Sequence, residues 1–171
     1  MSERITVVAG DITTLKVDAI VNAANSALAG GGGVDGAIHR AAGPALASAC
    51  ASIRRRQGGC PVGQAVKTTA GNLPARAVIH TVGPIWRDGG QHEPALLRQA
   101  YLSCLAIARQ ERMKTIAFPN ISTGVYGFPK AQAARIAIDA VSGFLKDNPW
   151  PENVIFACFD RENAQLYRSQ L

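Results

Sequence analysis

Short apolar runs of strand type alternate with amphipathic helical segments along the chain, and this alternation limits the fold more than any other feature. Strand-like runs are expected at residues 5–9, 19–22, 65–69, 76–82, 115–118 and 154–159. Several of them are apolar throughout, which is typical of strands covered on both faces. Helices are expected at residues 34–42, from Pro44 onward, at 93–112, from Pro129 onward and at 160–171. The alternation predicts an α/β/α sandwich, in which helices cover both faces of a central sheet.

Length and composition narrow the class of protein. A chain of 171 residues suits one domain, here residues 1–171, and its 47% apolar content is ample for a single core. No stretch approaches the roughly 18 unbroken apolar residues of a membrane helix, and the first residues do not read as an export signal. The four cysteines form no close pair, so we expect buried, reduced thiols in a cytoplasmic protein.

The net charge of +6 and the pI near 9.5 favour anionic partners, such as nucleotides, phosphates or nucleic acid. The basic residues are scattered except for Arg54, Arg55 and Arg56. These follow an amphipathic run, which favours a position in the last turn of a helix, where cations suit the helix dipole. A nucleic-acid patch is the alternative interpretation of this cluster.

Four consecutive glycines, Gly30 to Gly33, follow the second expected strand. Tandem glycines allow a backbone to approach a ligand closely, with bare N–H groups directed at an anion. The pattern Gly31-x-Gly33-x-x-Gly36 matches the dinucleotide fingerprint, but that fingerprint should follow the first strand immediately. No Gly-Lys-Ser/Thr follows either. The run therefore predicts phosphate binding, and neither an NAD oxidoreductase nor an NTPase.

Polar residues flank the glycines and follow other expected strands. Asn22, Asn25 and Asp35 supply hydrogen-bonding groups at the edge of the glycine loop, with Asp35 a candidate base. A second glycine-bearing loop, residues 120–127, precedes the helix that begins near Pro129, where unpaired N–H groups attract anions. In such folds ligands bind beyond the carboxyl ends of the strands. Two cradles in one small domain indicate a ligand with two phosphates.

Several of these residues have two interpretations. Asp11 is either a turn aspartate or an acceptor for a donor such as an exocyclic base amine. Asp35 is either a helix N-terminal acid or a group that acts on the ligand. Tyr126 reads as a ligand contact, whereas Phe159 is a core residue or a ring that stacks on a base.

Other classes of catalytic site are not supported. His39 and His80 are expected to be structural, because no two histidines have a metal-ligand spacing. Neither a metal nor a cofactor is expected. Ser122 has no evident histidine and aspartate partners in a nucleophile motif, which argues against a serine hydrolase.

Four motifs, in this order and spacing, resemble the macrodomain family, in particular its MacroD-type branch and most closely the bacterial O-acetyl-ADP-ribose deacetylases. They are Gly-Asp-Ile-Thr at residues 10–13, Val-Asn-Ala-Ala-Asn at 21–25, the segment from the glycine run to Gly43 at 30–43, and Ile-Ser-Thr-Gly-Val-Tyr-Gly at 121–127. The resemblance covers essentially the whole chain. It implies a mixed, mostly parallel sheet of about six strands and a cleft for ADP-ribose.

The resemblance also implies a role for each motif residue. Asp11 and the Ile12 backbone would contact adenine, with Phe159 stacked nearby. Asn25 would hold the distal ribose, which Tyr126 would cover. The diphosphate would lie between two loops, one containing Gly31, Gly32, Gly33 and Val34, the other containing Ser122, Thr123, Gly124 and Val125.

The resemblance implies hydrolysis of an ester on the distal ribose, either an acetyl group or the carboxylate of an ADP-ribosylated protein. Asp35 would orient or deprotonate the water. Because an ordinary carboxylate is a weak base at neutral pH, the ligand's own diphosphate is an alternative activator. Two other functions remain open at this stage: a reader that binds ADP-ribose without turnover, and a regulatory or nucleic-acid-binding role.

Overall fold

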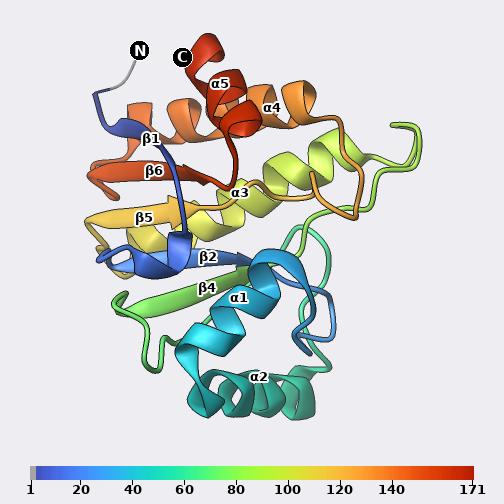
Figure 1. The fold of residues 1–171 in the computed structure, drawn as a ribbon, viewed down its shortest axis with the longest axis vertical. Helices are drawn as coiled ribbons and strands as arrows, with labels where there is room; N and C mark the ends of the chain where they lie inside the picture. Colours follow the sequence, from blue (N-terminus) through green and yellow to red (C-terminus); the bar gives the residue numbers. More distant parts are fainter. Residues whose placement is uncertain (1–2) are drawn as a thin grey trace.

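The computed structural model describes residues 3–171, and within that range six strands form one sheet in the order β1-β6-β5-β2-β4-β3 (Figure 1). The strands are β1 (Ile5–Ala9), β2 (Ala19–Ala23), β3 (Ala65–Thr69), β4 (Ala77–Thr81), β5 (Thr115–Phe118) and β6 (Asn153–Cys158). Neighbouring strands are parallel except for the edge pair β3 and β4. The expectation of a mixed, mostly parallel sheet is therefore confirmed.

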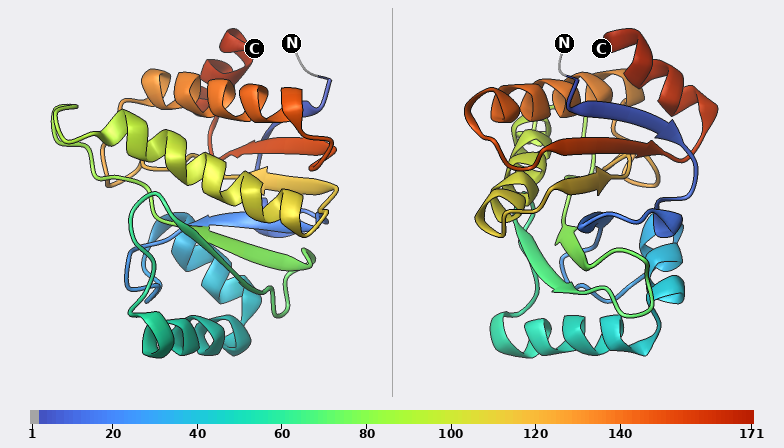
Figure 2. Two further views of the ribbon diagram at one scale, coloured as in Figure 1. Left: turned by 180° about the vertical axis from the view of Figure 1, so that it is seen from behind. Right: turned by 90° about the vertical axis from the view of Figure 1, so that its left-hand side faces the viewer.

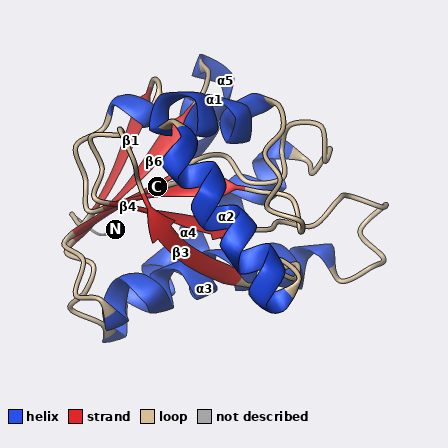
Figure 3. Ribbon diagram, turned by 90° about the horizontal axis from the view of Figure 1, so that it is seen from below, coloured by secondary structure: helices blue, strands red, loops and turns tan. Residues whose placement is uncertain are grey.

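Helices cover both faces of this sheet. They are the short 3₁₀ helix η1 (Ile12–Thr14), α1 (Gly33–Ala42), α2 (Pro44–Gln57), α3 (Glu93–Gln110), α4 (Lys130–Asp147) and α5 (Arg161–Gln170). Seen from behind, α3 and α4 lie over the sheet (Figure 2, left), and the view from below places α1 on the opposite side from α3 (Figure 3). Helix α5 packs on α4 and on β1.

Two apolar cores separate these layers. Successive residues of a strand point to opposite faces, so Val21 joins the core under α3 and α4 whereas Ile20 joins the core under α1 and α2. Phe118 and Phe156 lie in the first core, and Leu46 in the second. Burying two such layers favours the fold through the hydrophobic effect. The predicted three-layer sandwich is confirmed.

The basic cluster ends a helix, as predicted. Arg54, Arg55 and Arg56 occupy the last turn of α2. Arg54 Nη1 donates a hydrogen bond to the carbonyl of Leu28 at 2.9 Å, which ties α2 to the segment preceding the glycine run. This contact gives Arg54 a structural role within the domain.

The cysteines are also as expected, because Cys50, Cys60, Cys104 and Cys158 are all unpaired and buried. Among residues 3–171, no helix combines the length and the apolar character needed to cross a membrane.

Candidate functional site

A cleft of about 950 Å³ lies beyond the carboxyl ends of the parallel strands. The segments that follow β1, β2, β4, β5 and β6 all contribute to it. Among its lining residues are Gly10, Asp11, Ile12, Ala23, Asn25, Gly83, Pro119, Asn120, Ile121 and Phe159. The convergence of polar loops predicted from the sequence is therefore present, at the end of the sheet where ligands of such folds bind. The volume suits a ligand of dinucleotide size.

The glycine run forms one wall of the cleft and leads directly into α1. Gly30 and Gly33 have positive φ angles of 79° and 57°, which a residue with a side chain rarely adopts. Gly32 is the N-cap of α1 and provides no side-chain hydrogen bond. The first N–H groups of the helix therefore lack intrahelical partners, and together with the helix dipole they favour an anion at this wall.

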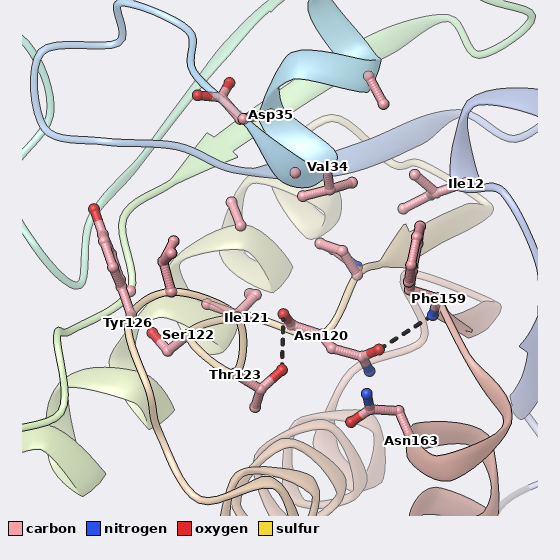
Figure 4. Close-up of a pocket in the computed structure, with 18 of the residues that line it drawn as sticks. Ile12, Val34, Asp35, Asn120, Ile121, Ser122, Thr123, Tyr126, Phe159 and Asn163 are labelled. Carbon is pink, nitrogen blue, oxygen red and sulfur yellow. Dashed lines mark hydrogen bonds between the residues drawn. The ribbon is translucent and has the colours of Figure 1, made fainter.

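The loop after β5 forms the opposite wall (Figure 4). Ser122 is buried and has a φ angle of 67°, and its Oγ makes no hydrogen bond within residues 3–171. The N–H of Phe128 donates to the Ser122 carbonyl at 2.9 Å, and the N–H of Trp86 donates to the Tyr126 carbonyl at 2.8 Å. These bonds hold the backbone of the loop, while Val125 at its tip is fully exposed.

Asp35 lies in the first turn of α1 and is 6% exposed. Its Oδ1 accepts a hydrogen bond from Asn22 Nδ2 at 2.8 Å and lies 3.4 Å from His39 Nε2. In the described part of the chain Oδ2 accepts no hydrogen bond. Asp35 lines the cleft at the same end as Tyr126 (Figure 4). A carboxylate held through one oxygen leaves the other available to a water molecule or a ligand hydroxyl.

Asn25 lines the cleft and also stabilises the loop before the glycines. Its Nδ2 donates to the Gly30 carbonyl at 2.9 Å, and its Oδ1 accepts from the Ala29 N–H at 3.0 Å. Both ends of this amide are therefore engaged with the backbone. One N–H of Nδ2 remains available to a ligand, since an amide nitrogen carries two.

The placement of Asn22 corrects one prediction. We expected Asn22 to contact the ligand, but it is fully buried and does not line the cleft. Strand β2 continues to Ala23, and alternation along the strand points Asn22 to the same face as Ile20, beneath α1. Asn22 therefore contacts the site through Asp35.

The far end of the cleft is formed by the segments after β1 and β6 (Figure 4). Asp11 Oδ1 accepts hydrogen bonds from the Thr13 hydroxyl at 2.7 Å and the Thr13 N–H at 2.9 Å, and both lower the pKa of Asp11. Asp11 is thus an ionised acceptor at neutral pH. Ile12 lines the cleft beside it. Phe159 stands 87% exposed at the rim, because β6 ends one residue earlier than expected.

Sequence reasoning missed several lining residues, among them Gly83, Asn120, Lys130 and Asn163. Asn120 Oδ1 accepts a hydrogen bond from the Phe159 N–H at 3.3 Å, which fixes the backbone under the exposed ring (Figure 4). Its position two residues after a buried strand was the available signal. Lys130 pairs with Glu162 at the side of the cleft.

Comparison with known proteins agrees with this geometry. Residues 21–137 match the family model described as Macro domain. The chain is 61% identical over 171 residues to the O-acetyl-ADP-ribose deacetylase of Enterobacter sp. (strain 638), covering 100% of this chain and 95% of that protein. It is 59% identical to the O-acetyl-ADP-ribose deacetylase of Escherichia coli (strain K12), covering 100% of this chain and 97% of that protein.

Solved structures show the same fold. A glycine-to-valine mutant of the Oceanobacillus iheyensis macrodomain with ADPR superposes with a TM-score of 0.92 at 41% identity, covering 96% of this chain and 89% of that one. The Trypanosoma brucei macrodomain in complex with ADP-ribose gives a TM-score of 0.88 at 42% identity, covering 97% and 68%. Together with the family match and the order of the motifs around the cleft, these likenesses show that the chain belongs to the Macro domain family.

Proposed function

We propose that this protein binds ADP-ribose and hydrolyses an ester on its distal ribose, deacetylating O-acetyl-ADP-ribose. The observation that carries the proposal is a buried Asp35 carboxylate, held through one oxygen at the end of a cleft between the N-terminus of α1 and the loop after β5. Relatives about 60% identical over the whole chain are named O-acetyl-ADP-ribose deacetylases. A single macrodomain spanning residues 1–171, in the cytoplasm, is part of the same proposal; the unpaired cysteines support that location.

The shape of the cleft supports one orientation of the ligand. Adenine would lie beside Asp11, an ionised acceptor, and Phe159, an exposed aromatic ring, which both line this part of the cleft. The diphosphate would lie between the N-terminus of α1 and the loop at residues 122–126. The distal ribose would then lie beside Tyr126 and Asp35, at the opposite end from Phe159 (Figure 4). Asn25, which also lines the cleft, would hold the same ribose.

Ester hydrolysis needs an oriented water and stabilisation of the negative charge that develops. Asp35 would accept a hydrogen bond from the water, orienting it or removing its proton, a contribution of roughly 10²–10⁴-fold for general base catalysis. Bare N–H groups of the glycine loop would help to stabilise the developing oxyanion. The ligand diphosphate remains the alternative proton acceptor. The same attack would release ADP-ribose from an aspartate or glutamate ester of a protein, and we include this second activity in the proposal.

The test compares Asp35→Ala with the control Asp139→Ala, an exposed aspartate of α4 outside the cleft. Binding of ADP-ribose is measured by calorimetry and deacetylation of O-acetyl-ADP-ribose by product release. We expect Asp35→Ala to lower kcat at least 100-fold while the Kd changes less than about fivefold, and Asp139→Ala to behave like the wild type. Unchanged turnover in Asp35→Ala would refute the role of Asp35.

A reader of ADP-ribose without turnover is the competing function. It predicts calorimetric binding by the wild type and no acetate release above the buffer rate. Asn25→Ala gives a further check of the site, since loss of its bonds to Ala29 and Gly30 should weaken both binding and turnover. ADP-ribose linked to a glutamate-containing peptide tests the second activity directly.

A further inference from the structure

A row of buried polar side chains runs away from the cleft beneath Asp35. Asn22 Nδ2 lies 2.8 Å from Asp35 Oδ1 and 3.1 Å from His80 Nδ1. His80 Nε2 lies 2.9 Å from Thr68 Oγ1, whose hydroxyl donates to the Thr69 carbonyl at 3.0 Å. Asn22 and His80 are fully buried and Thr68 is 8% exposed. The row therefore joins the interior of the sheet to the one buried carboxylate of the cleft.

The sheet itself builds this row. Asn22 of β2 and His80 of β4 are paired residues in the parallel register, so their side chains lie on the same face. His80 is paired in turn with Val66 of β3, and Thr68 lies two residues further along that strand on the same face. Neighbouring positions on this face hold apolar residues such as Ile20 and Val78. Apolar side chains here would avoid the cost of burying polar groups, so stability alone does not account for the row.

Counting donors and acceptors gives each bond a direction. Asn22 Nδ2 carries two hydrogens, and Asp35 Oδ1 accepts one of them. His80 Nδ1 must then accept the other, which leaves the ring proton on Nε2 to be donated to Thr68. Thr68 donates onward to the Thr69 carbonyl. Every bond is satisfied only with neutral His80 in the Nε2–H tautomer.

The surroundings of His80 support the neutral ring. Burial, together with a smaller effect of the nearby His39, lowers the pKa of His80 to about 4. The other titratable groups near the ring are Asp35, reached through Asn22, and Cys50, whose Sγ lies 3.9 Å from Nε2. The other end of the Asn22 amide has no partner, because its Oδ1 makes no hydrogen bond in residues 3–171. The amide is oriented to direct both of its N–H groups, at the cost of an unpaired carbonyl.

We propose that His80 and Thr68 are positioning residues for Asp35, which act through Asn22 by fixing the orientation of its amide. This inference rests on the proposed function, since it assigns Asp35 to ester hydrolysis. Without the acceptor at His80 Nδ1, the Asn22 amide would rotate and Asp35 Oδ1 would lose its donor. The carboxylate would then no longer hold the orientation that water activation needs.

Two substitutions test the roles of the two ring nitrogens of His80 separately. In His80→Asn, the side-chain oxygen takes the place of Nδ1 and keeps an acceptor for Asn22. In His80→Gln, the terminal amide takes the place of Nε2, keeping the contact with Thr68 and losing that acceptor. We expect kcat to fall at least tenfold in His80→Gln and less than threefold in His80→Asn, with the Kd for ADP-ribose within threefold in both. Thr68→Val should lower kcat, and Thr68→Ser should restore it.

Nuclear magnetic resonance supplies readouts that do not need turnover, and the first of them needs only the wild type. In the wild type, the ¹⁵N signals of His80 should show the proton on Nε2 throughout the range from pH 5.5 to 8. The ¹³C signal of the Asp35 carboxylate should move in His80→Gln and stay in place in His80→Asn. If the wild type fails to deacetylate, the proposed function fails, and these signals still decide whether the row orients Asp35.

Three results would overturn the inference. The first is equal kcat in His80→Asn and His80→Gln. The second is a parallel fall of kcat and affinity that follows the loss of folded protein, which is the signature of a purely structural histidine. The third is a proton on Nδ1 of the wild-type ring.

Discussion

The carbonyl oxygen of Gly31 occupies the space that a β-carbon on Gly36 would need. Gly36 lies in the first turns of α1, so the glycine run folds back against the helix that follows it. This close approach brings the N-terminus of α1 to the wall of the cleft. The last glycine of the pattern therefore has a packing role that is separate from any contact with the ligand.

Gly36→Ala should force the Gly31 backbone to move and so distort the anion-binding wall. We expect a loss of about 1–3 kcal/mol in the free energy of unfolding and at least a tenfold weaker Kd for ADP-ribose. The control is Gly143→Ala in α4, where a β-carbon meets nothing within 4 Å. Because alanine is the better helix former, this control should gain roughly 0.5–1 kcal/mol. Urea unfolding and calorimetry check both variants, and equal effects would contradict the packing role of Gly36.

Phe159→Ala tests the aromatic rim. The ring is 87% exposed, so its removal should change the free energy of unfolding by less than about 0.5 kcal/mol. Loss of stacking on adenine should weaken ADP-ribose binding by roughly 1–3 kcal/mol. Ile85→Ala, at a half-exposed residue outside the cleft, is the control and should change neither quantity. Unchanged affinity in Phe159→Ala would remove the ring from the binding site.

Asp11→Asn tests the contact with the base. The asparagine keeps an oxygen for Thr13 but replaces the second carboxylate oxygen by an NH₂ group, which opposes the adenine amine. We expect a stable variant that binds ADP-ribose about tenfold or more weakly, given roughly 1.5–3 kcal/mol for a hydrogen bond to a charged group. A ligand with hypoxanthine in place of adenine should bind more weakly to the wild type, but not to Asp11→Asn. The same preference for adenine in both proteins would contradict the assignment.

The depressed pKa of His80, about 4, predicts a pH-dependent stability. The pKa of a histidine in an unfolded chain is about 6.5, so the unfolded chain takes up this proton first as the pH falls. The contribution of neutral His80 to the free energy of unfolding is therefore complete above about pH 6.5 and is lost as the pH falls toward 4. About 2 kcal/mol of unfolding free energy should disappear between pH 7.5 and pH 5. Urea unfolding should show a smaller loss in His80→Asn, and an equal loss in both proteins would contradict the shift.

The layers of the fold were predictable because a strand that is buried on both faces is apolar throughout. Residues 115–118 are apolar throughout and form β5 as expected. Some predicted strand ends were wrong by one residue. The last strand was expected to include Phe159, but it ends at Cys158, which frees the ring. The second strand extends one residue further than expected, to Ala23.

The candidate site was predictable in its polar loops but not in its buried support. Asn25 and Asp35 were predicted as site residues because they flank the glycine run. Asn22 looks like another ligand contact until the register of β2 with β4 places it opposite His80. That register brings together residues far apart in the chain, and a single sequence does not reveal which strands are neighbours. His80 was therefore expected to be structural, without any indication of its partners.

The strand order determines when during synthesis one end of the cleft can form. The first strand, β1, pairs only with β6, the last strand in the described part of the chain. The end of the cleft that we propose for adenine is lined by Asp11, just after β1, and Phe159, just after β6. During synthesis, Asp11 emerges from the ribosome long before the strand that gives β1 its place in the sheet. Ligand binding at this end therefore requires that synthesis has passed Phe159, and bound ligand stabilises the fold that joins these two segments by mass action.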